Sequence, residues 1–88
     1  MNTIYIVLYS TQAKKSLDKI PSFIAERIVA KIKLLPTEPY LGVKMNGDIS
    51  SSRKIKVSNY RVIYQIFEAK VFIEILEIES RGNVSYDR

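Results

Sequence analysis

The side chains of this sequence that could do chemistry are mainly cations, and a group of them lies near the middle of the chain. Between residues 44 and 61 there are five Lys or Arg residues and a single acid, Asp48. The five cations are Lys44, Arg53, Lys54, Lys56 and Arg61. From residue 68 to residue 79 the sign reverses, with four glutamates and one lysine. Such a basic stripe is typical of a solvated strand face or of a surface that binds an anion, nucleic acid first.

The residue types that the sequence lacks exclude several classes of chemistry. Its 88 residues include no cysteine and no histidine. Disulfides, thiol nucleophiles, Ser-His or Cys-His pairs and the common cysteine or imidazole metal sites are therefore excluded. We expect no metal and no other cofactor. The net charge of +5 favours an anionic partner.

Two helices are predicted after a first strand at residues 3–9, which is rich in Ile, Val and Tyr. Ser10 suits the N-cap of the first helix, and Pro21 suits the first turn of the second. Pro36 and Pro39 end the second helix. The residues expected to face the core are Ala13, Leu17 and Ile20, followed by Ile24, Ile28, Ile32 and Leu35. Those expected to face water are Glu26, Arg27, Lys31 and Lys33.

The rest of the chain predicts a loop followed by three strands. Residues 36–52 are irregular, with room for a short edge strand near Lys44, and strands are predicted at 53–57, 60–67 and 70–78. Tight turns are predicted at Ser58-Asn59, where Asn59 tolerates a positive φ, and at Glu68-Ala69. We therefore expect an α+β fold of order β-α-α-β-β-β. Its helical hairpin packs on one face of a mostly antiparallel four-stranded sheet.

The length of the chain predicts one domain over residues 1–88. The longest apolar run near the start, residues 4–9, is too short to span a bilayer, and no basic segment precedes it. We expect a cytoplasmic protein without a membrane partner.

The two-residue turn at 58–59 places Lys56 directly opposite Arg61, with Lys54 on the same side of the sheet. Like charges in that position destabilise a strand pair by a few tenths of a kcal/mol or more. Folding alone gives little reason for this pair, whereas a phosphate held between the cations would turn repulsion into attraction.

The two faces of the predicted sheet differ in character. The expected core face carries Ile55, Val57, Tyr60, Val62, Tyr64, Ile66, Val71, Ile73 and Ile75. The charged face also carries apolar residues, namely Ile63, Phe67, Phe72, Leu76 and Ile78. They form a surface for a protein partner, or segment 36–52 or the C-terminus folds over them.

The sequence combines Lys-x-Lys, Tyr-Arg-x-x-Tyr, a late arginine and a terminal tyrosine, a set that is typical of one toxin family. Residues 53–67, RKIKVSNYRVIYQIF, followed by an acidic-apolar strand and SRGNVSY at 80–86, resemble the RelE toxins of the RelE/ParE superfamily. Residues 14–35, KKSLDKIPSFIAERIVAKIKLL, resemble that family's helical hairpin, with the proline at its junction. The resemblance implies the toxin of a type II toxin–antitoxin system, with a RelE-like fold. It also implies a ribosome-dependent endoribonuclease that cuts mRNA in the A site without a metal, and an acidic, RelB-like antitoxin as partner.

The resemblance carries over to five residues. Lys54 and Lys56 match the two lysines of the Lys-x-Lys strand, and Arg61 matches the arginine after the hairpin tyrosine. Arg81 matches the late arginine and Tyr86 the terminal tyrosine. The turn before Arg61 is shorter than in some relatives, and Gly82-Asn83 replaces residues that are often more basic.

In the mechanism that the resemblance implies, the substrate 2′-hydroxyl attacks its own phosphate and leaves a 2′,3′-cyclic phosphate and a 5′-hydroxyl. A lysine crowded by other cations loses its proton more readily, so Lys54 or Lys56 could be the base. Arg61 and Arg81 would clamp the phosphate, and Tyr86 would stack on a base or orient the 2′-hydroxyl.

Two other functions fit the sequence. One is a ParE-like toxin that poisons gyrase by binding, although that branch generally lacks this set of cations. The other is a basic RNA- or ribosome-binding module without enzymatic activity. An antitoxin could act by covering the cations or by displacing the C-terminal segment with Arg81 and Tyr86.

Overall fold

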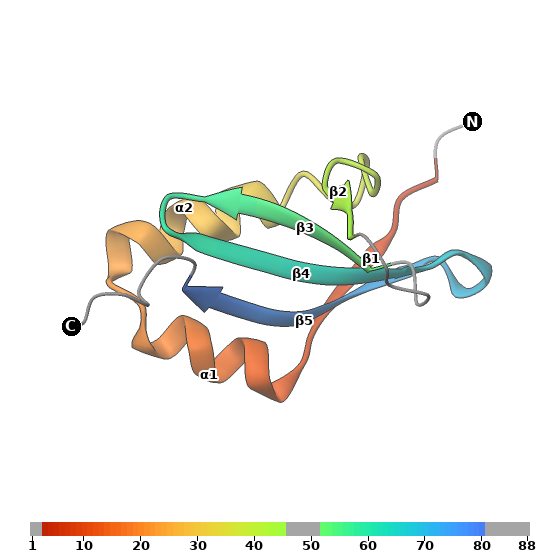
Figure 1. Ribbon diagram of the computed structural model, residues 1–88. Coiled ribbons are helices and arrows are strands. Elements are labelled where there is room, and N and C mark those ends of the chain that lie inside the picture. Colours follow the sequence, from red (N-terminus) through yellow and green to blue (C-terminus); the bar gives the residue numbers. More distant parts are fainter. Residues whose placement is uncertain (1–2, 46–51, 81–88) are drawn as a thin grey trace.

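A five-stranded sheet with two helices on one of its faces makes up the part of the chain that the computed structural model describes, residues 3–45 and 52–80 (Figure 1). The strands lie in the order β1-β5-β4-β3-β2, with β1 parallel to β5 and all other pairs antiparallel. The elements are β1 (Ile6–Tyr9), α1 (Thr11–Lys19), α2 (Ser22–Ile32), β2 (Val43–Lys44), β3 (Ser52–Val57), β4 (Tyr60–Phe67), a 3₁₀ turn (Glu68–Lys70) and β5 (Phe72–Ser80). The predicted α+β fold is confirmed, and the short edge strand near Lys44 makes the sheet five-stranded.

The helices begin and pack as their sequences predict. The Ser10 hydroxyl accepts the N–H of Ala13 at 3.0 Å and donates to the carbonyl of Leu76 at 2.8 Å, so the N-cap of α1 is also tied to β5. Helix α1 lies along β5 and α2 lies along β3. The buried apolar residues between the two layers are Ala13, Ile20, Ile28, Ile32, Leu35, Ile55, Val57, Val62, Tyr64, Ile73, Ile75 and Ile78. Neither helix is long and apolar enough to cross a membrane.

A bulge in β5 changes which residues face the helices. Ile63 pairs with Glu77, but the next residue, Tyr64, pairs with Ile75, which leaves Leu76 as an extra residue. Such an extra residue reverses the alternation of side chains beyond it. Ile78 therefore packs into the core with 3% of its surface exposed, and its predicted place on the charged face is wrong.

The turn between β4 and β5 is longer than predicted. Phe67 pairs with Phe72, so residues 68–71 form the connection, and the predicted tight turn at Glu68-Ala69 is wrong. Val71, expected in the strand, adopts a left-handed conformation with φ 55° and ψ 46°. At the other turn the positive φ is at Ser58 (54°) rather than at Asn59, while the predicted pairing of Val57 with Tyr60 is confirmed.

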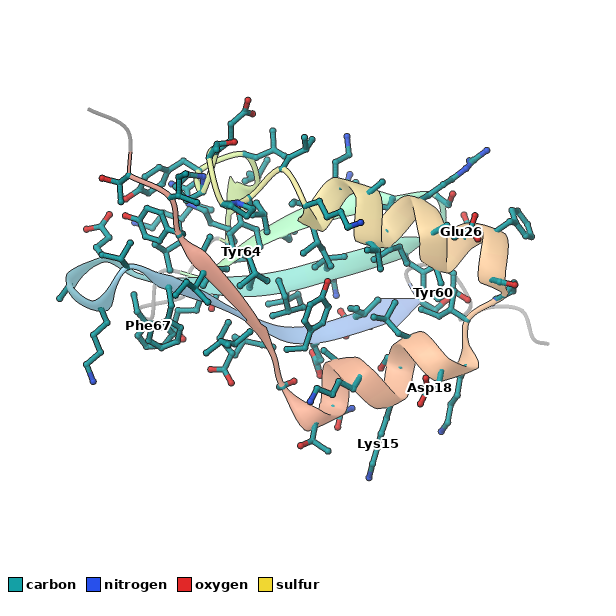
Figure 2. The ribbon with its side chains drawn as sticks, turned by 180° about the vertical axis from the view of Figure 1, so that it is seen from behind. Lys15, Asp18, Glu26, Tyr60, Tyr64 and Phe67 are labelled. Carbon is teal, nitrogen blue, oxygen red and sulfur yellow. The ribbon has the colours of Figure 1, made fainter. Side chains whose placement is uncertain are left out.

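The hydroxyl of Tyr64 fastens the segment that leads into β2. Tyr64 is fully buried on β4; its hydroxyl accepts the N–H of Gly42 and donates to the carbonyl of Pro39, both at 2.8 Å. Burial raises the pKa of this hydroxyl. A Cβ on Gly42 would lie only 2.8 Å from the carbonyl oxygen of Lys54 and from the Tyr64 hydroxyl, so only glycine fits here. Figure 2 shows Tyr60, Tyr64 and Phe67 spread along β4, with Phe67 near the β4–β5 turn.

Replacing Tyr64 by phenylalanine tests this fastening. Tyr64→Phe leaves the N–H of Gly42 and the carbonyl of Pro39 without their partner. We expect the free energy of unfolding, measured by urea denaturation, to fall by about 1–3 kcal/mol. The control Tyr40→Phe keeps the ring that lies under Arg53 and should cost less than about 0.5 kcal/mol. Equal stability of the Tyr64→Phe variant and the wild type would contradict the assignment.

Candidate functional site

The face of the sheet opposite the helices, here called the far face, carries three of the predicted site residues. Lys54 and Lys56 come from β3, whose intervening residue Ile55 is buried among the helices. Arg61 pairs directly with Lys56, as the sequence predicts. Because paired residues share a face, Lys54, Lys56 and Arg61 lie on the same side of the sheet.

The other two cations of the basic stripe lie on the helix side. Lys44 pairs with Arg53, and Arg53 pairs with Tyr64, which is buried under the helical layer. The Arg53 Nη1 donates to the carbonyl of Gly42 at 2.6 Å, and its guanidinium lies 4.9 Å from the centre of the Tyr40 ring. Arg53 therefore holds the segment before β2, and the stripe seen in the sequence is divided between two faces.

Arg61 has an ionic partner that sequence reasoning missed. Its Nε donates to Oε2 of Glu79 at 2.8 Å, and its Nη2 contacts the same oxygen. Both side chains are about one-third exposed, so the pair is partly screened by solvent. Glu79 lies next to Arg61 because the pairing of β4 with β5 places these two residues opposite each other.

The Arg61–Glu79 pair changes the meaning of the like-charge contact. The row across the sheet reads Lys56, Arg61, Glu79, so the acid on one side of Arg61 offsets the lysine on the other. Folding alone therefore accounts for placing Lys56 against Arg61. Repulsion between these two cations is not by itself a sign of an anion site.

Lys54 and Lys56 line an open pocket at the edge of the sheet. Strand β2 pairs with β3 only at Arg53 and Lys54, so the edge of β3 beyond Lys54 has no strand partner among the described residues. The pocket has a volume of about 340 Å³. Its lining residues are Lys31, Leu41, Gly42, Val43, Lys54, Ile55 and Lys56. Lys31 of α2, which the sequence analysis only expected to face water, thus joins the two site lysines.

The other end of the far face is apolar. The rings of Phe67 and Phe72 stack with their centres 4.5 Å apart and an angle of 7° between their planes. Strand β1 adds Ile6, which pairs with Phe72, and Leu8; each of these two side chains is at least half exposed. The sequence placed both phenylalanines on this face but missed the contribution of β1, because the parallel pairing of β1 with β5 leaves no local signal.

Two predicted site residues, Arg81 and Tyr86, lie outside the described residues. Within residues 3–45 and 52–80, no three Asp or Glu side chains lie close enough together to hold a metal ion. The chemistry available from the described part of the site is that of two lysines and an arginine, which can bind a phosphate and stabilise its charge.

Comparison with known proteins identifies the family. The sequence matches the family model described as "ParE toxin of type II toxin-antitoxin system, parDE" over residues 7–84. The search of curated proteins found no match.

Several solved structures share the fold. A chain of the archaeal RelE–RelB complex from Pyrococcus horikoshii OT3 has a TM-score of 0.80 at 25% identity, with 93% of this chain and 100% of that chain covered. The isolated E. coli RelE toxin gives 0.80 at 24% identity, with 92% and 88% covered. A chain of the chromosomal ParDE system from P. aeruginosa gives 0.71 at 15% identity, with 90% and 98% covered. The last two show a common fold alone. The family model spans most of the sequence, and the chain therefore belongs to the ParE toxin family of type II toxin–antitoxin systems, within the RelE/ParE superfamily.

Proposed function

We propose that this type II toxin is a ribosome-dependent endoribonuclease that cleaves mRNA in the A site. The observation that carries the proposal is the grouping of Lys54, Lys56 and Arg61 on the far face, with Lys56 directly opposite Arg61. A phosphodiester on this surface would meet two lysine side chains and a guanidinium within one strand pair. Cleavage by attack of the 2′-hydroxyl needs positive charge next to the phosphate. It needs no histidine if a lysine takes the proton of that hydroxyl.

The reaction is an intramolecular transfer of the phosphoryl group. The 2′-oxygen forms a bond to phosphorus, the bond from phosphorus to the 5′-oxygen breaks, and a 2′,3′-cyclic phosphate is left. One of Lys54 and Lys56, as the neutral amine, takes the proton of the 2′-hydroxyl and becomes an ammonium. The ammonium of the other lysine donates a proton to the leaving 5′-oxygen. Arg61 stabilises the negative charge on the phosphoryl oxygens, because its guanidinium stays charged throughout. Arg81 and Tyr86 remain proposed contributors on the strength of the resemblance.

Glu79 bears on how Arg61 would meet a substrate. One carboxylate oxygen of Glu79 contacts both Nε and Nη2 of the guanidinium. A phosphate would therefore bind Arg61 through its remaining N–H groups or would displace Glu79. In either case Glu79 weakens binding of the phosphate in the ground state, and it fixes the guanidinium in one orientation.

An acidic antitoxin is the proposed protein partner. The archaeal RelE that this chain resembles was solved in a complex with RelB. The excess of positive charge in this chain suits an acidic partner, and the apolar side chains Ile6, Leu8, Phe67 and Phe72 offer it a surface.

The match to the ParE family model favours a second function, the poisoning of gyrase without nuclease activity. Induced expression of the toxin separates the candidates. Growth arrest with mRNA cuts at defined codons supports the nuclease, and arrest with DNA damage supports the gyrase poison. Expression without arrest supports a basic RNA- or ribosome-binding module.

Alanine substitutions test the proposed site. We expect Lys54→Ala and Lys56→Ala to slow cleavage of ribosome-bound mRNA, by about 10²–10⁴-fold for the lysine that acts as the base. Arg61→Ala should also slow cleavage, because the charge on the phosphoryl oxygens loses its clamp. Lys33→Ala, an exposed cation of the segment after α2, should leave the rate unchanged. Wild-type rates in all three site variants, each shown to be folded by circular dichroism, would overturn the site.

Removing the charge of Glu79 tests its competition with phosphate. We expect Glu79→Gln to bind an uncleavable 2′-O-methyl RNA more tightly, by up to about fivefold, as expected for a partly exposed ion pair of about 0.2–1 kcal/mol. Fluorescence anisotropy measures the affinity. Glu77→Gln removes the same charge opposite Ile63 and should have a smaller effect. If both variants bind RNA equally well, the contact with Arg61 has no specific role.

A further inference from the structure

The pocket at the free edge of β3 joins two site lysines to a third lysine from the helical layer. Lys31 lies on α2 beside the buried residues Ile28 and Ile32, at the margin of the helix face that packs on the sheet. Because α2 lies along β3, this position brings Lys31 to the edge of that strand. The pocket therefore extends from the far face around the strand edge to α2.

The opposite wall of the pocket is held in place by the fold. Two hydrogen bonds hold the backbone of Gly42. Its N–H donates to the Tyr64 hydroxyl, and its carbonyl accepts from Arg53. The close contact of Gly42 with the backbone of β3 leaves no room for a side chain there. The short β2 begins at the next residue, Val43, and the edge of β3 at Lys56 remains open among the described residues. The pocket is thus a consequence of where the sheet stops.

The described residues that line this pocket carry positive charge only. Of the described residues that line it, three are lysines and none is acidic. The neighbouring pocket beside Arg53 contains Glu68, and the groove along the helices contains Glu26. The sole ion pair formed by the described residues is that of Arg61 with Glu79. Within residues 3–45 and 52–80, Lys31, Lys54 and Lys56 thus have no carboxylate paired with them.

We propose that this pocket binds a phosphate group of the RNA backbone, adjacent to the one that is cleaved, and that Lys31 is a positioning residue for the substrate. The inference rests on the proposed function, because Lys54 and Lys56 belong to both sites. An ammonium group binds phosphate as a compact point charge, and each phosphodiester of an RNA backbone carries one negative charge. Three lysines around one pocket can therefore contact a phosphate and its neighbour along the strand. Leu41 and Val43, both exposed, provide apolar contact for a ribose.

The size of the pocket favours RNA over an acidic helix. Lys54 and Lys56 are two positions apart on β3, about 6.6 Å, a step that suits successive phosphates of an extended single strand and alternate residues of an extended peptide alike. A pocket of about 340 Å³ takes a phosphate and its sugar rather than a helix. A strand of RNA held on the far face would continue around the edge of β3 and reach Lys31.

Salt-dependent binding tests the inference without any cleavage. The probe is a short 2′-O-methyl RNA, and its affinity for the full chain is measured by anisotropy at several salt concentrations. We expect Lys31→Ala to weaken binding about fivefold and to reduce the slope of log affinity against log salt by about 0.7, the value for one phosphate contact on a single strand. Lys31→Arg should keep the slope. The matched control Lys33→Ala, an exposed lysine two residues further along the chain, should change neither quantity.

Three results would overturn the inference. One is an equal effect of Lys31→Ala and Lys33→Ala on RNA affinity. Another is an unchanged salt slope in Lys31→Ala. The third is a loss of binding to poly-glutamate in Lys31→Ala with RNA binding intact, which would assign the pocket to an acidic protein.

The experiment separates this inference from the proposed function. If the toxin cleaves mRNA, Lys31→Ala should raise KM several-fold and leave kcat near the wild-type value, since Lys31 contacts the substrate away from the reacting atoms. If the toxin cleaves nothing but Lys31→Ala still lowers the salt slope, the phosphate pocket stands and the nuclease proposal falls. If cleavage depends on Arg61 but KM is unaffected by Lys31→Ala, the nuclease stands and the pocket falls.

Discussion

Arg61 lies between Lys56 on one neighbouring strand and Glu79 on the other, and the charge balance of the far face follows from this row. The row depends on the bulge at Leu76. Without the extra residue, β5 beyond the bulge would turn over, Ile78 would leave the core and Glu79 would point toward the helices. The hydroxyl of Ser10 donates to the Leu76 carbonyl, so the start of α1 contacts the bulge directly. The burial of Ile78 and the pairing of Arg61 are therefore consequences of one backbone feature.

Strand alternation gives adjacent cations of β3 different tasks. Arg53 points to the helix side, where it contacts the Gly42 carbonyl and the Tyr40 ring, whereas Lys54 points to the far face. The first holds the wall of the edge pocket, and the second lines that pocket. A count of charges along the sequence cannot separate these two tasks, because it treats both residues as one basic stripe. Substitution of Arg53 would disturb the segment before β2, so a change in ligand binding could not be assigned to the lost charge alone.

Local patterns in the sequence predicted the elements and one register, but not the contacts that depend on long-range pairing. Periodicity located both helices and the three C-terminal strands, and the Ser58-Asn59 turn fixed Lys56 opposite Arg61. The β4–β5 register was missed because the connection has four residues, with a β-branched valine in the left-handed region that no turn rule favours. The predicted turn would have placed Leu76 opposite Arg61. Glu79 was missed for the same reason, and Lys31 was missed because only the packing of α2 along β3 brings it to the site.

The fold does not choose between a nuclease and a gyrase poison, because both RelE and ParE structures share it. The choice depends on what the surface can hold. Repulsion between Lys56 and Arg61 first suggested an anion, but Glu79 supplies a structural reason for that pair. The surface best suited to an anion is therefore the edge of β3, where three lysines line one pocket without an acid among the described lining residues. Keeping uncompensated charge together costs folding free energy, and a ligand that carries negative charge offsets that cost. Lysines on a free strand edge also hinder its pairing with another chain, but that role does not require Lys31, which comes from α2.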